Sequence, residues 1–532
     1  MKRLLVILLV AAMVFTAVGC SSGTSVEDAA TNYFAEYPGS RIVTAADLFA
    51  KIDAGDEPFV LSIRQAADYA KGHIKGAYLA AWGTDLAEKV SMLPTDETVY
   101  VYCYSGQTAG QTVALLNMLG VEAVSVKSGY VLGVSKTEGF EAYVDTAAAV
   151  EIPDAGAKMD KKVLEYVEGY FNAIPDGGSN IIAPADAKPL IDAGDVVVVD
   201  IRKSDDYTAA HIDGAVNIPF GAGMQENFSN LPTDKKIIVT CYSGQTAGQT
   251  VGVMKALGYN AVSLKYGMGD KGWGGYVKTT VANNYFADYP GSRIITWEDL
   301  FAKIDADEEP FILSIRQEDV YTEGHIKGAA LASWGIDLAK AVSMLPKDEP
   351  VYVYCYSGQT AGQTVALLNM MDIEAISVKS GFNKGAMTID GYEAYVTTDV
   401  TELADAGADF DAVMLKEVED YFTAVSDNAN FKIGWDDAQA AVEAGEATVL
   451  DIRQAADFEA GHIVGAINIP WGGGMQENFV DLPSGKLIVA CYSGQTAGQA
   501  TAVLRMLGND AVSLHYGMKV GWIANGYPIV TN

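Results

Sequence analysis

The sequence has few cysteines and histidines for its length, and they are not clustered. Its 532 residues include 5 Cys and 5 His. No segment brings them together at the short spacings that zinc sites use, so a metal centre is not expected. There is also no glycine fingerprint between a strand and a helix of the kind that holds dinucleotide phosphates. We therefore expect neither a metal nor an organic cofactor.

Basic side chains are scarce as well. The 36 Lys and Arg stand against 68 Asp and Glu, which gives a formal net charge of −32. A surface of that sign repels nucleic acid, so a nucleic-acid partner is excluded. We interpret the acidity as a solubility surface.

Beyond the N-terminus, no apolar run is long enough to span a bilayer. Residues 1–19 combine a basic start, Lys2 and Arg3, with an apolar stretch that ends in the string AVGC. This arrangement is typical of a bacterial lipoprotein export signal. We expect residues 1–19 to be a cleaved signal peptide, Cys20 to carry lipid, and residues 20–30 to tether an exported protein to the periplasmic or cell-surface side of a membrane. The alternative is an ordinary cleaved signal peptide.

What the sequence does have is internal repetition. The string CYSGQTAG occurs four times, beginning at Cys103, Cys241, Cys355 and Cys491. The first and third copies share an upstream FVLSIRQ or FILSIRQ, whereas the second and fourth follow VVVDIR or TVLDIR. This A-B-A-B order predicts a duplicated two-domain unit. The expected domains are residues 31–148, 158–280, 281–400 and 411–532.

Within each unit, short buried apolar segments alternate with helical segments. In the first unit we predict strands at 59–63, Val99–Tyr102 and Ala123–Val126, and helices at Ala45–Asp53 and 108–119. Strands separated by helices favour an α/β domain whose parallel sheet is covered by helices on both faces.

Each repeated cysteine follows a buried strand and precedes a helix. In parallel sheets, the carboxyl ends of strands and the helix N-termini bring together backbone N–H groups and positive dipole ends. Such surroundings favour the thiolate of a cysteine. Gly106 suits a tight curve in this loop, and Thr108 suits the cap of the following helix. We therefore predict reactive thiols, because inert core cysteines would not require the same following residues four times.

The ordered set of motifs resembles the rhodanese family. Beside the cysteine loop, it includes Asp-Ile-Arg at Asp200 and Asp451, a His-Ile-x-Gly-Ala segment at His73, and a late Tyr-Gly-Met segment at Tyr266 and Tyr516. The resemblance implies four tandem rhodanese-like domains with sulfurtransferase activity.

The family resemblance also implies a covalent mechanism. A cysteine thiolate takes sulfane sulfur from thiosulfate or polysulfide, becomes a persulfide, and passes the sulfur to a thiol or cyanide acceptor. On this basis the four loop cysteines are the nucleophiles. The five residues after each form the substrate-binding cradle: Tyr104, Ser105, Gly106, Gln107, Thr108; Tyr242, Ser243, Gly244, Gln245, Thr246; Tyr356, Ser357, Gly358, Gln359, Thr360; and Tyr492, Ser493, Gly494, Gln495, Thr496.

The chain departs from the family in two ways. Its loop has no basic residue to bind an anionic donor; the candidates to replace one, after the next strand, are Lys127, Lys265, Lys379 and, in the fourth unit, His515. The A units also have Ser62 and Ser314 where the B units have Asp200 and Asp451. We therefore expect two kinds of site.

Three further repeated positions have a predicted role. A histidine before each cysteine is expected to form structural hydrogen bonds in preference to acting as a base: His73, His211, His325, His462. An arginine after a buried strand is expected to pair with an acid within five residues: Arg64 with Asp68, Arg202 with Asp206, Arg316 with Asp319, Arg453 with Asp457. One aromatic per unit either walls the pocket or packs in the core: Trp82, Phe220, Trp334, Trp471.

Two alternatives to an enzyme with small sulfur-containing substrates remain. The chain is a carrier that loads sulfur, polysulfide or selenium and delivers it to a membrane partner, such as a redox protein. Less favoured is a related phosphatase or arsenate reductase, because their loops end in Arg whereas this loop ends in Thr.

Overall fold

The chain folds into α/β domains, each with a five-stranded sheet. The computed structural model describes residues 24–35, 39–174, 178–287, 291–425 and 430–531. The predicted signal peptide and Cys20 lie outside these residues. The chain divides into two compact units, of which the first contains residues up to Ile181 with 221–234 and 245–262, and the second contains the remainder.

The first sheet has the order β1-β6-β5-β2-β4, and all its strands are parallel. These strands are β1 (Ile42–Val43), β6 (Ala123–Val126), β5 (Val99–Tyr102), β2 (Phe59–Ser62) and β4 (Tyr78–Leu79). The central strand β5 is buried along its whole length. The three strands predicted for this domain are therefore confirmed.

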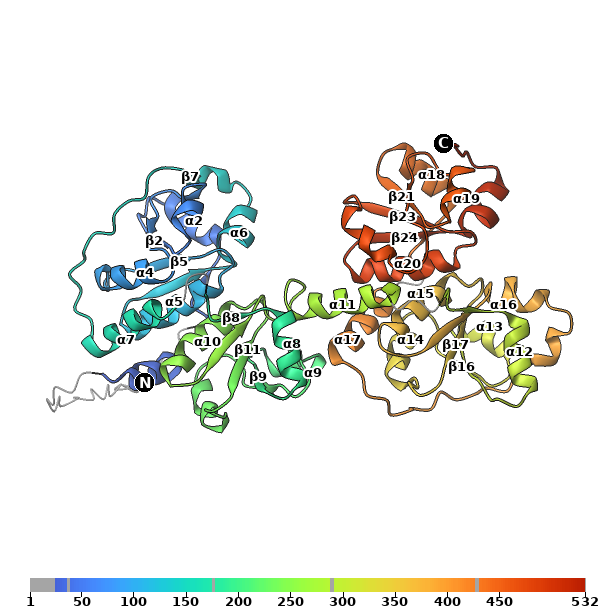
Figure 1. The fold of residues 1–532 in the computed structure, drawn as a ribbon, viewed down its shortest axis with the longest axis horizontal. Helices are drawn as coiled ribbons and strands as arrows, with labels where there is room; N and C mark the ends of the chain where they lie inside the picture. Colours follow the sequence, from blue (N-terminus) through green and yellow to red (C-terminus); the bar gives the residue numbers. More distant parts are fainter. Residues whose placement is uncertain (1–23, 36–38, 175–177, 288–290, 426–429, 532) are drawn as a thin grey trace, which may run out of the picture. The chain divides into compact units, whose positions relative to one another are not determined.

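Helices cover both faces of this sheet (Figure 1). Helix α2 (Ala45–Asp53) places Leu48 against Tyr100 and Tyr102 of the central strand. Because side chains alternate along a strand, the opposite face is free to receive α5 (Gln107–Met118), which packs on β5 and β6. The layered parallel sheet that the sequence predicts is confirmed.

The other three domains repeat this strand order. The second sheet contains β8 (Ile181–Ile182), β9 (Val196–Asp200), β10 (Val216–Asn217), β11 (Lys236–Thr240) and β12 (Ala261–Leu264); the third contains β13 (Ile294–Ile295), β14 (Phe311–Ser314), β16 (Ala329–Leu331), β17 (Val351–Tyr354) and β18 (Ala375–Val378); the fourth contains β20 (Lys432–Ile433), β21 (Ala447–Asp451), β22 (Ile467–Asn468), β23 (Lys486–Ala490) and β24 (Asp510–Leu514). In each sheet the middle strand is the one that precedes the repeated cysteine.

The helices follow the same repetition. Those that bear on the site are α1 (Val26–Ala35), α3 (Ala66–Tyr69), α4 (Thr84–Lys89), α7 (Lys161–Asn172), α10 (Gln245–Ala256), α11 (Trp273–Ala287), α14 (Ile336–Ala341), α15 (Gln359–Asn369), α17 (Ala412–Thr423), α18 (Trp435–Glu443) and α20 (Gln495–Met506). The first and third domains add a small antiparallel pair, in which His73–Ile74 lies beside Val144–Asp145 and His325–Ile326 beside Val396–Thr397.

Four of these helices precede a domain in sequence but pack on a neighbour. Helix α7 contacts α4, α17 contacts α14, α11 contacts α20, and α1 contacts both α5 and α10. Residues 26–30, which we expected in the tether, form the first half of α1. In its second half, Tyr33 and Phe34 are buried. Helices α7 and α17, which begin the second and fourth expected domains, therefore also contact the domain before them.

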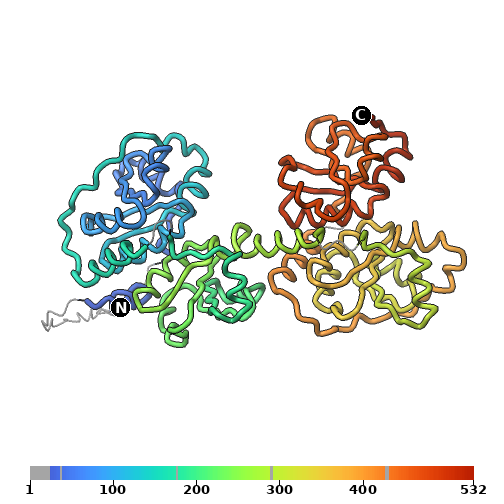
Figure 2. The backbone as a smooth tube through the Cα atoms, viewed as in Figure 1, coloured from blue at the N-terminus to red at the C-terminus, as the bar shows by residue number. Residues whose placement is uncertain are grey.

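The join between the second and third domains is helical. The backbone from Trp273 to Ala287 is one continuous helix, α11 (Figure 2). The boundary that we expected between residues 280 and 281 falls inside it.

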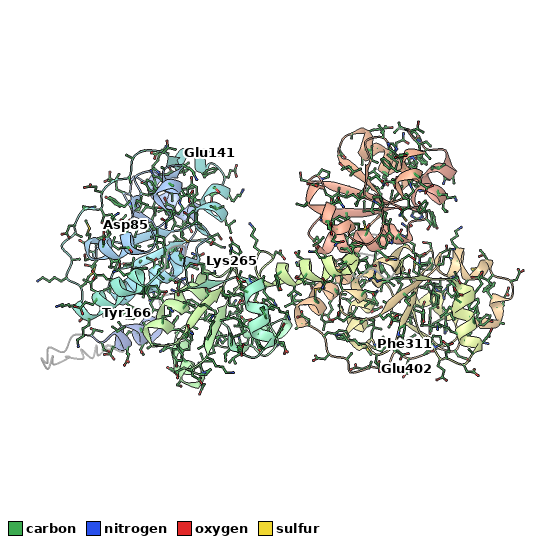
Figure 3. All side chains as sticks on the ribbon, in the orientation of Figure 1. Asp85, Glu141, Tyr166, Lys265, Phe311 and Glu402 are labelled. Atoms are coloured by element: carbon green, nitrogen blue, oxygen red, sulfur yellow. The ribbon has the colours of Figure 1, made fainter. Side chains whose placement is uncertain are left out.

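Acidic side chains such as Glu141 and Glu402 are exposed (Figure 3). In the part of the chain that the structure describes, no helix is both long and apolar enough to cross a membrane. Among the same residues, no group of three or more His, Cys, Asp and Glu side chains is placed to hold a metal ion.

The buried arginine distinguishes A from B domains. In the fourth domain, Arg453 pairs with Asp451, with Nη2 2.6 Å from Oδ2 and Nε 3.0 Å from Oδ1. Arg202 pairs with Asp200 in the same way. The predicted pairing of these arginines with Asp206 and Asp457 is wrong, because the buried carboxylate two residues earlier is already in contact.

In the A domains, an aromatic ring replaces this carboxylate. The guanidinium of Arg64 lies 3.9 Å from the ring centre of Tyr130 and donates to the carbonyl of Gly72. Arg316 lies 4.1 Å from the ring centre of Phe382. A cation over an aromatic face is stabilised without a counter-charge, which allows serine at the position of the aspartate.

We predict that Asp451→Asn destabilises the fourth domain by about 3–5 kcal/mol, because it leaves Arg453 buried without its counter-charge. Hydrogen exchange of β21 and β23 in urea measures the change. Asp510→Asn is the control, because its carboxylate is 58% exposed and 3.5 Å from Arg505. Equal effects of the two substitutions would contradict the prediction.

Candidate functional site

The four repeated cysteines occupy equivalent places at the carboxyl ends of the central strands. Cys103, Cys241, Cys355 and Cys491 are free thiols, and each is only 2% exposed. Each lies between a buried strand and the N-terminus of a helix, as the sequence predicts.

At least one backbone N–H of the loop donates to each sulfur. In the fourth domain, the Sγ of Cys491 accepts from the N–H of Gly494 at 3.0 Å and of Ala497 at 3.3 Å. The corresponding glycine N–H lies 3.0 to 3.1 Å from its cysteine in the other domains, at Gly106, Gly244 and Gly358. N–H donors and a helix N-terminus stabilise negative charge on sulfur. The geometry suits a thiolate or a persulfide anion.

A glycine in the left-handed backbone conformation turns the loop into the helix. Gly106 has φ 94° and is the N-cap of α5, without any side-chain cap. An L-residue with a side chain is strained in that conformation. The helix begins at Gln107, so the predicted capping role of Thr108 is wrong.

A cavity opens beside the loop of the first domain. It measures about 600 Å³ and is lined by Tyr104, Thr108 and Trp82 together with Gly178 from the segment that follows α7. The indole Nε1 of Trp82 donates to the carbonyl of Gly178 at 3.1 Å. The pocket therefore combines two repeats, and Trp82 both lines it and contacts the ring of Phe171 at 5.4 Å.

The loop tyrosine is fixed by an acid on α3. The hydroxyl of Tyr104 donates to Asp68 at 2.7 Å and accepts from the N–H of Gln65 at 3.1 Å. Burial and the Asp68 carboxylate raise the pKa of Tyr104, so the phenol stays neutral. Asp68 thus binds the loop tyrosine, although we expected it to pair with Arg64.

The repeated histidines contact backbone and acid groups near their own turn. His73 Nδ1 lies 3.0 Å from the carbonyl of Tyr69, and Nε2 lies 3.0 Å from Asp145. His325 lies between the carbonyls of Tyr321 and Asp399, at 2.8 and 3.0 Å. These contacts agree with the structural role that the sequence favours.

The first glutamine of the motif contacts a neighbouring domain. Gln495 Nε2 donates to Ser377 Oγ at 2.7 Å and to the carbonyl of Val378 at 3.1 Å, and its Oε1 accepts from the N–H of Ser380 at 3.0 Å. Gln359 forms the reciprocal set with Ser513, Leu514 and Tyr516, and Gln245 forms the same set with Ser125, Val126 and Ser128. These side chains, which we assigned to the substrate cradle, are therefore occupied elsewhere.

The turn that Gln495 holds supports the loop of Cys355. A Cβ on Gly381 would lie 2.6 Å from both the Cys355 carbonyl and the Ser357 N, so only glycine fits there. The N–H of Phe382 donates to the Cys355 carbonyl at 2.8 Å. Each of these two cysteine loops is therefore braced by a glutamine that follows the other cysteine.

A second glutamine, which directly follows each CYSGQTAG string, binds a tyrosine from one of the packing helices. Gln363 Oε1 accepts from Tyr421 at 2.7 Å, and its Nε2 donates to the carbonyl of Asn430 at 2.9 Å. The same tyrosine bond recurs at 2.6 to 2.7 Å in Tyr33–Gln249, Tyr170–Gln111 and Tyr285–Gln499. Sequence reasoning missed this role because it assigned the cysteine and the five residues after it to the site and gave no role to this glutamine. The available signal was that the string continues into the helix in both A and B contexts.

Gln495→Met keeps the side-chain length but removes the bonds to three partners in the third domain. We expect faster alkylation at Cys355 or loss of protection in its loop, because unpaired buried groups cost about 1–3 kcal/mol each. Peptide-resolved alkylation with hydrogen exchange measures this. Gln439→Met on the surface of α18, which breaks only a bond to Glu443, is the control and should change neither.

The basic residues that we proposed to face the pocket do not do so in the first domain. Lys127, Lys265 and Lys379 are exposed, as Figure 3 shows for Lys265, and Lys127 is not among the residues that line the cavity. His515 is half-buried, and burial together with the charge of Lys432 lowers its pKa.

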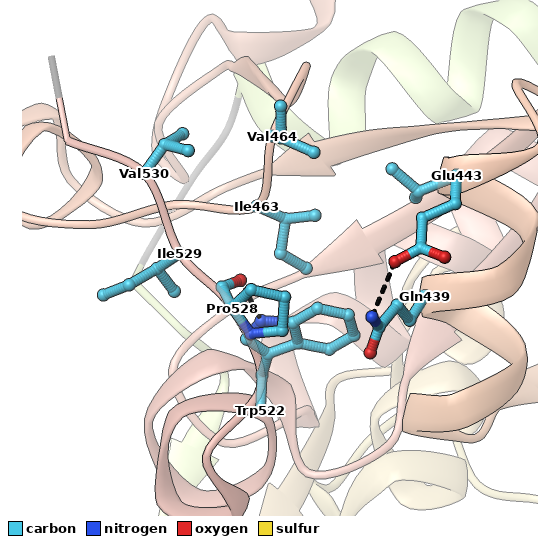
Figure 4. A pocket seen from close by; sticks show the side chains of 9 residues that line it. Gln439, Glu443, Ile463, Val464, Trp522, Pro528, Ile529 and Val530 are labelled. Carbon is cyan, nitrogen blue, oxygen red and sulfur yellow. Dashed lines mark hydrogen bonds between the residues drawn. The ribbon is translucent and has the colours of Figure 1, made fainter.

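A second, smaller cavity lies in the fourth domain (Figure 4). It measures about 50 Å³, and Ile463, Val464, Trp522 and Ile529 make it largely apolar. No residue of the Cys491 loop lines it. Its size and lining fit a packing defect better than a substrate site.

Each domain is thus a five-stranded α/β domain with one free cysteine at the end of its central strand, where loop N–H groups donate to the sulfur. The rhodanese-like domain family model matches residues 44–135, 183–272, 296–397 and 435–525. The chain belongs to this family and contains four tandem copies of its domain. Each match begins after the helix that packs on a neighbour.

Several relatives carry sulfurtransferase names. The chain is 25% identical over 283 residues to the thiosulfate sulfurtransferase of Pseudomonas aeruginosa, covering 45% of this chain and 96% of that protein. It is 34% identical to thiosulfate sulfurtransferase 16, chloroplastic, of Arabidopsis thaliana, covering 15% and 76%. Other matches are partial: they span 23% of a tRNA sulfurtransferase from Desulfurococcus amylolyticus and 39% of an HTH-type transcriptional regulator from Mycobacterium tuberculosis.

Among solved structures, a rhodanese-related protein from Thermoplasma volcanium is 30% identical. The alignment covers 98% of that chain and 19% of this one, with a TM-score of 0.18.

Proposed function

We propose that this protein is a sulfurtransferase that moves sulfane sulfur from thiosulfate or polysulfide to a thiol or cyanide through cysteine persulfides. The observation that carries the proposal is the glycine N–H within 3.0 to 3.1 Å of the sulfur in all four domains. A loop N–H that donates to a single thiol suits a sulfur that is anionic before and after transfer.

The reaction has two balanced half-steps. The cysteine thiolate attacks the sulfane sulfur of thiosulfate, the sulfur–sulfur bond of the donor breaks, and sulfite leaves with the electron pair. The acceptor thiolate then attacks the outer sulfur of the persulfide, and the cysteine thiolate leaves. In the first domain, Tyr104 and Thr108 line the cavity in which the donor would bind.

The most direct test treats the full chain with thiosulfate or polysulfide and measures each cysteine peptide by mass spectrometry. We expect Cys103, Cys241, Cys355 and Cys491 to gain the mass of one sulfur atom, and a thiol acceptor to remove it. Four single Cys→Ser variants identify the sites that contribute to turnover. Absence of any sulfur gain in the wild-type protein would refute the proposal.

The same experiment separates enzyme from carrier. The 2% exposure of each thiol favours a protected persulfide, as a carrier of sulfur, polysulfide or selenium would need. Repeated turnover with a small acceptor supports the enzyme. Stable loading that only a membrane redox partner can discharge supports the carrier.

We also propose that the protein is exported and held on a bacterial membrane by lipid at Cys20. The basic start and apolar stretch of residues 1–19 support this. In the native host, Cys20→Ala is expected to move the protein from the membrane fraction, measured by fractionation and palmitate labelling. Cys103→Ser should leave the fractionation unchanged. An unlabelled wild-type protein would contradict lipid anchoring.

A further inference from the structure

One cation reaches a cysteine site from another domain. Lys432 is the first residue of β20, and its register partner in the parallel strand β24 is Ser513. Paired residues of parallel strands place their side chains on the same face of a sheet. Lys432 is half-buried there.

That face of the fourth domain holds the cysteine loop of the third. Ser513 Oγ accepts a hydrogen bond from Gln359 Nε2 at 3.2 Å. Gln359 directly follows Gly358, whose N–H lies 3.1 Å from the Sγ of Cys355. A short series of contacts therefore joins the strand position of Lys432 to the reactive sulfur.

The electrostatics agree with this placement. Burial lowers the pKa of Lys432, and the electrostatic interaction with Cys355 partly opposes this lowering. The positive charge of Lys432 in turn contributes to the lowered pKa of His515. No ion pair between Lys432 and a carboxylate is present among the described residues. Cys355 is thus the group whose charge would interact with this cation.

The other domains have isoleucine at this position. Ile294 is paired with Ser377, and Ser377 Oγ accepts from Gln495, so Ile294 faces the Cys491 loop as Lys432 faces the Cys355 loop. Ile42 is likewise paired with Ser125, which accepts from Gln245. In the second domain, Ile181 begins the equivalent edge strand β8. The lysine is therefore a feature of one site out of four.

We propose that Lys432 is a specificity-determining residue that makes the Cys355 site the preferred entry point for small anionic sulfane donors of the thiosulfate type. The inference rests on the proposed persulfide chemistry. Lys432 attracts the anionic donor and stabilises the charge on the departing sulfite, while the thiolate forms its new bond to the sulfane sulfur. The loop has no basic side chain of its own, so the cation is supplied by the neighbouring domain.

The test compares full-length wild type with Lys432→Ile, which installs the residue that the other three domains carry. Both are exposed briefly to thiosulfate, quenched by alkylation, and measured peptide by peptide. Loss of one charge near a partly buried anion should slow Cys355 loading about tenfold. Loading at the other three cysteines should stay within about twofold. Lys432→Arg should retain most of the rate.

The reciprocal variant provides a gain of function. Ile294→Lys places a cation on the third-domain face that holds the Cys491 loop. Cys491 loading by thiosulfate should rise several-fold and become more sensitive to ionic strength, because added salt screens the new charge. Cys355 should be unaffected.

Dimethyl trisulfide is an uncharged sulfur donor. Comparing it with thiosulfate separates recognition of the donor's negative charge from a general change in the reactivity of the Cys355 loop. The ratio of thiosulfate to trisulfide reactivity at Cys355 should fall about tenfold in Lys432→Ile. Equal loss with both donors, or unchanged thiosulfate loading, would overturn the role of Lys432. Failure of all four cysteines to load in the wild type would instead reject the proposed function.

Discussion

The close contact between the helices that follow the cysteine loops is the constraint on which the rest of the structure depends. A Cβ on Gly498 would lie 2.3 Å from the Gln359 carbonyl, and one on Gly362 would lie 2.4 Å from the Gln495 carbonyl. Only glycine permits α15 and α20 to approach this closely at the point where both helices begin. The same approach recurs between α5 and α10, where Gly110 meets the Gln245 carbonyl.

This contact explains why one string serves two purposes. Its first half, Cys-Tyr-Ser-Gly, curves backbone N–H groups around a sulfur. Its second half, Gln-Thr-Ala-Gly-Gln, supplies small residues for helix contact and amides that bond across it. Because the two halves are continuous, the geometry of each sulfur site is mechanically linked to the contact between helices.

Much of the fold follows from local pattern. Helix α2 and strands β5 and β6 have the bounds that the sequence predicts, because the apolar residues in these segments are buried within their own domain. The cysteine loop is predictable for the same reason: strand, glycine and helix are adjacent in the chain. The sequence does not predict which side chains pair when the choice depends on burial in the folded sheet. Nothing near Arg453 in sequence distinguishes Asp451 from Asp457, and only the buried register of β21 selects the former.

Remote partners also account for what the sequence did not reveal about the site. The lysines that follow β6 and β18 are near the loops in sequence order but are exposed, whereas Lys432 comes from a different domain. A residue that acts on a neighbour's loop can be recognised only when the contact between domains is known.

The covalent tandem arrangement has an evolutionary consequence. In a symmetric homodimer, every substitution at the contact appears twice, so a lysine that faces one loop must face both. Duplication within a single polypeptide removes that symmetry, and each copy can mutate independently while the shared helix contact preserves assembly. The single lysine among three isoleucines at equivalent strand positions is the kind of divergence that gene fusion permits and a homodimer forbids.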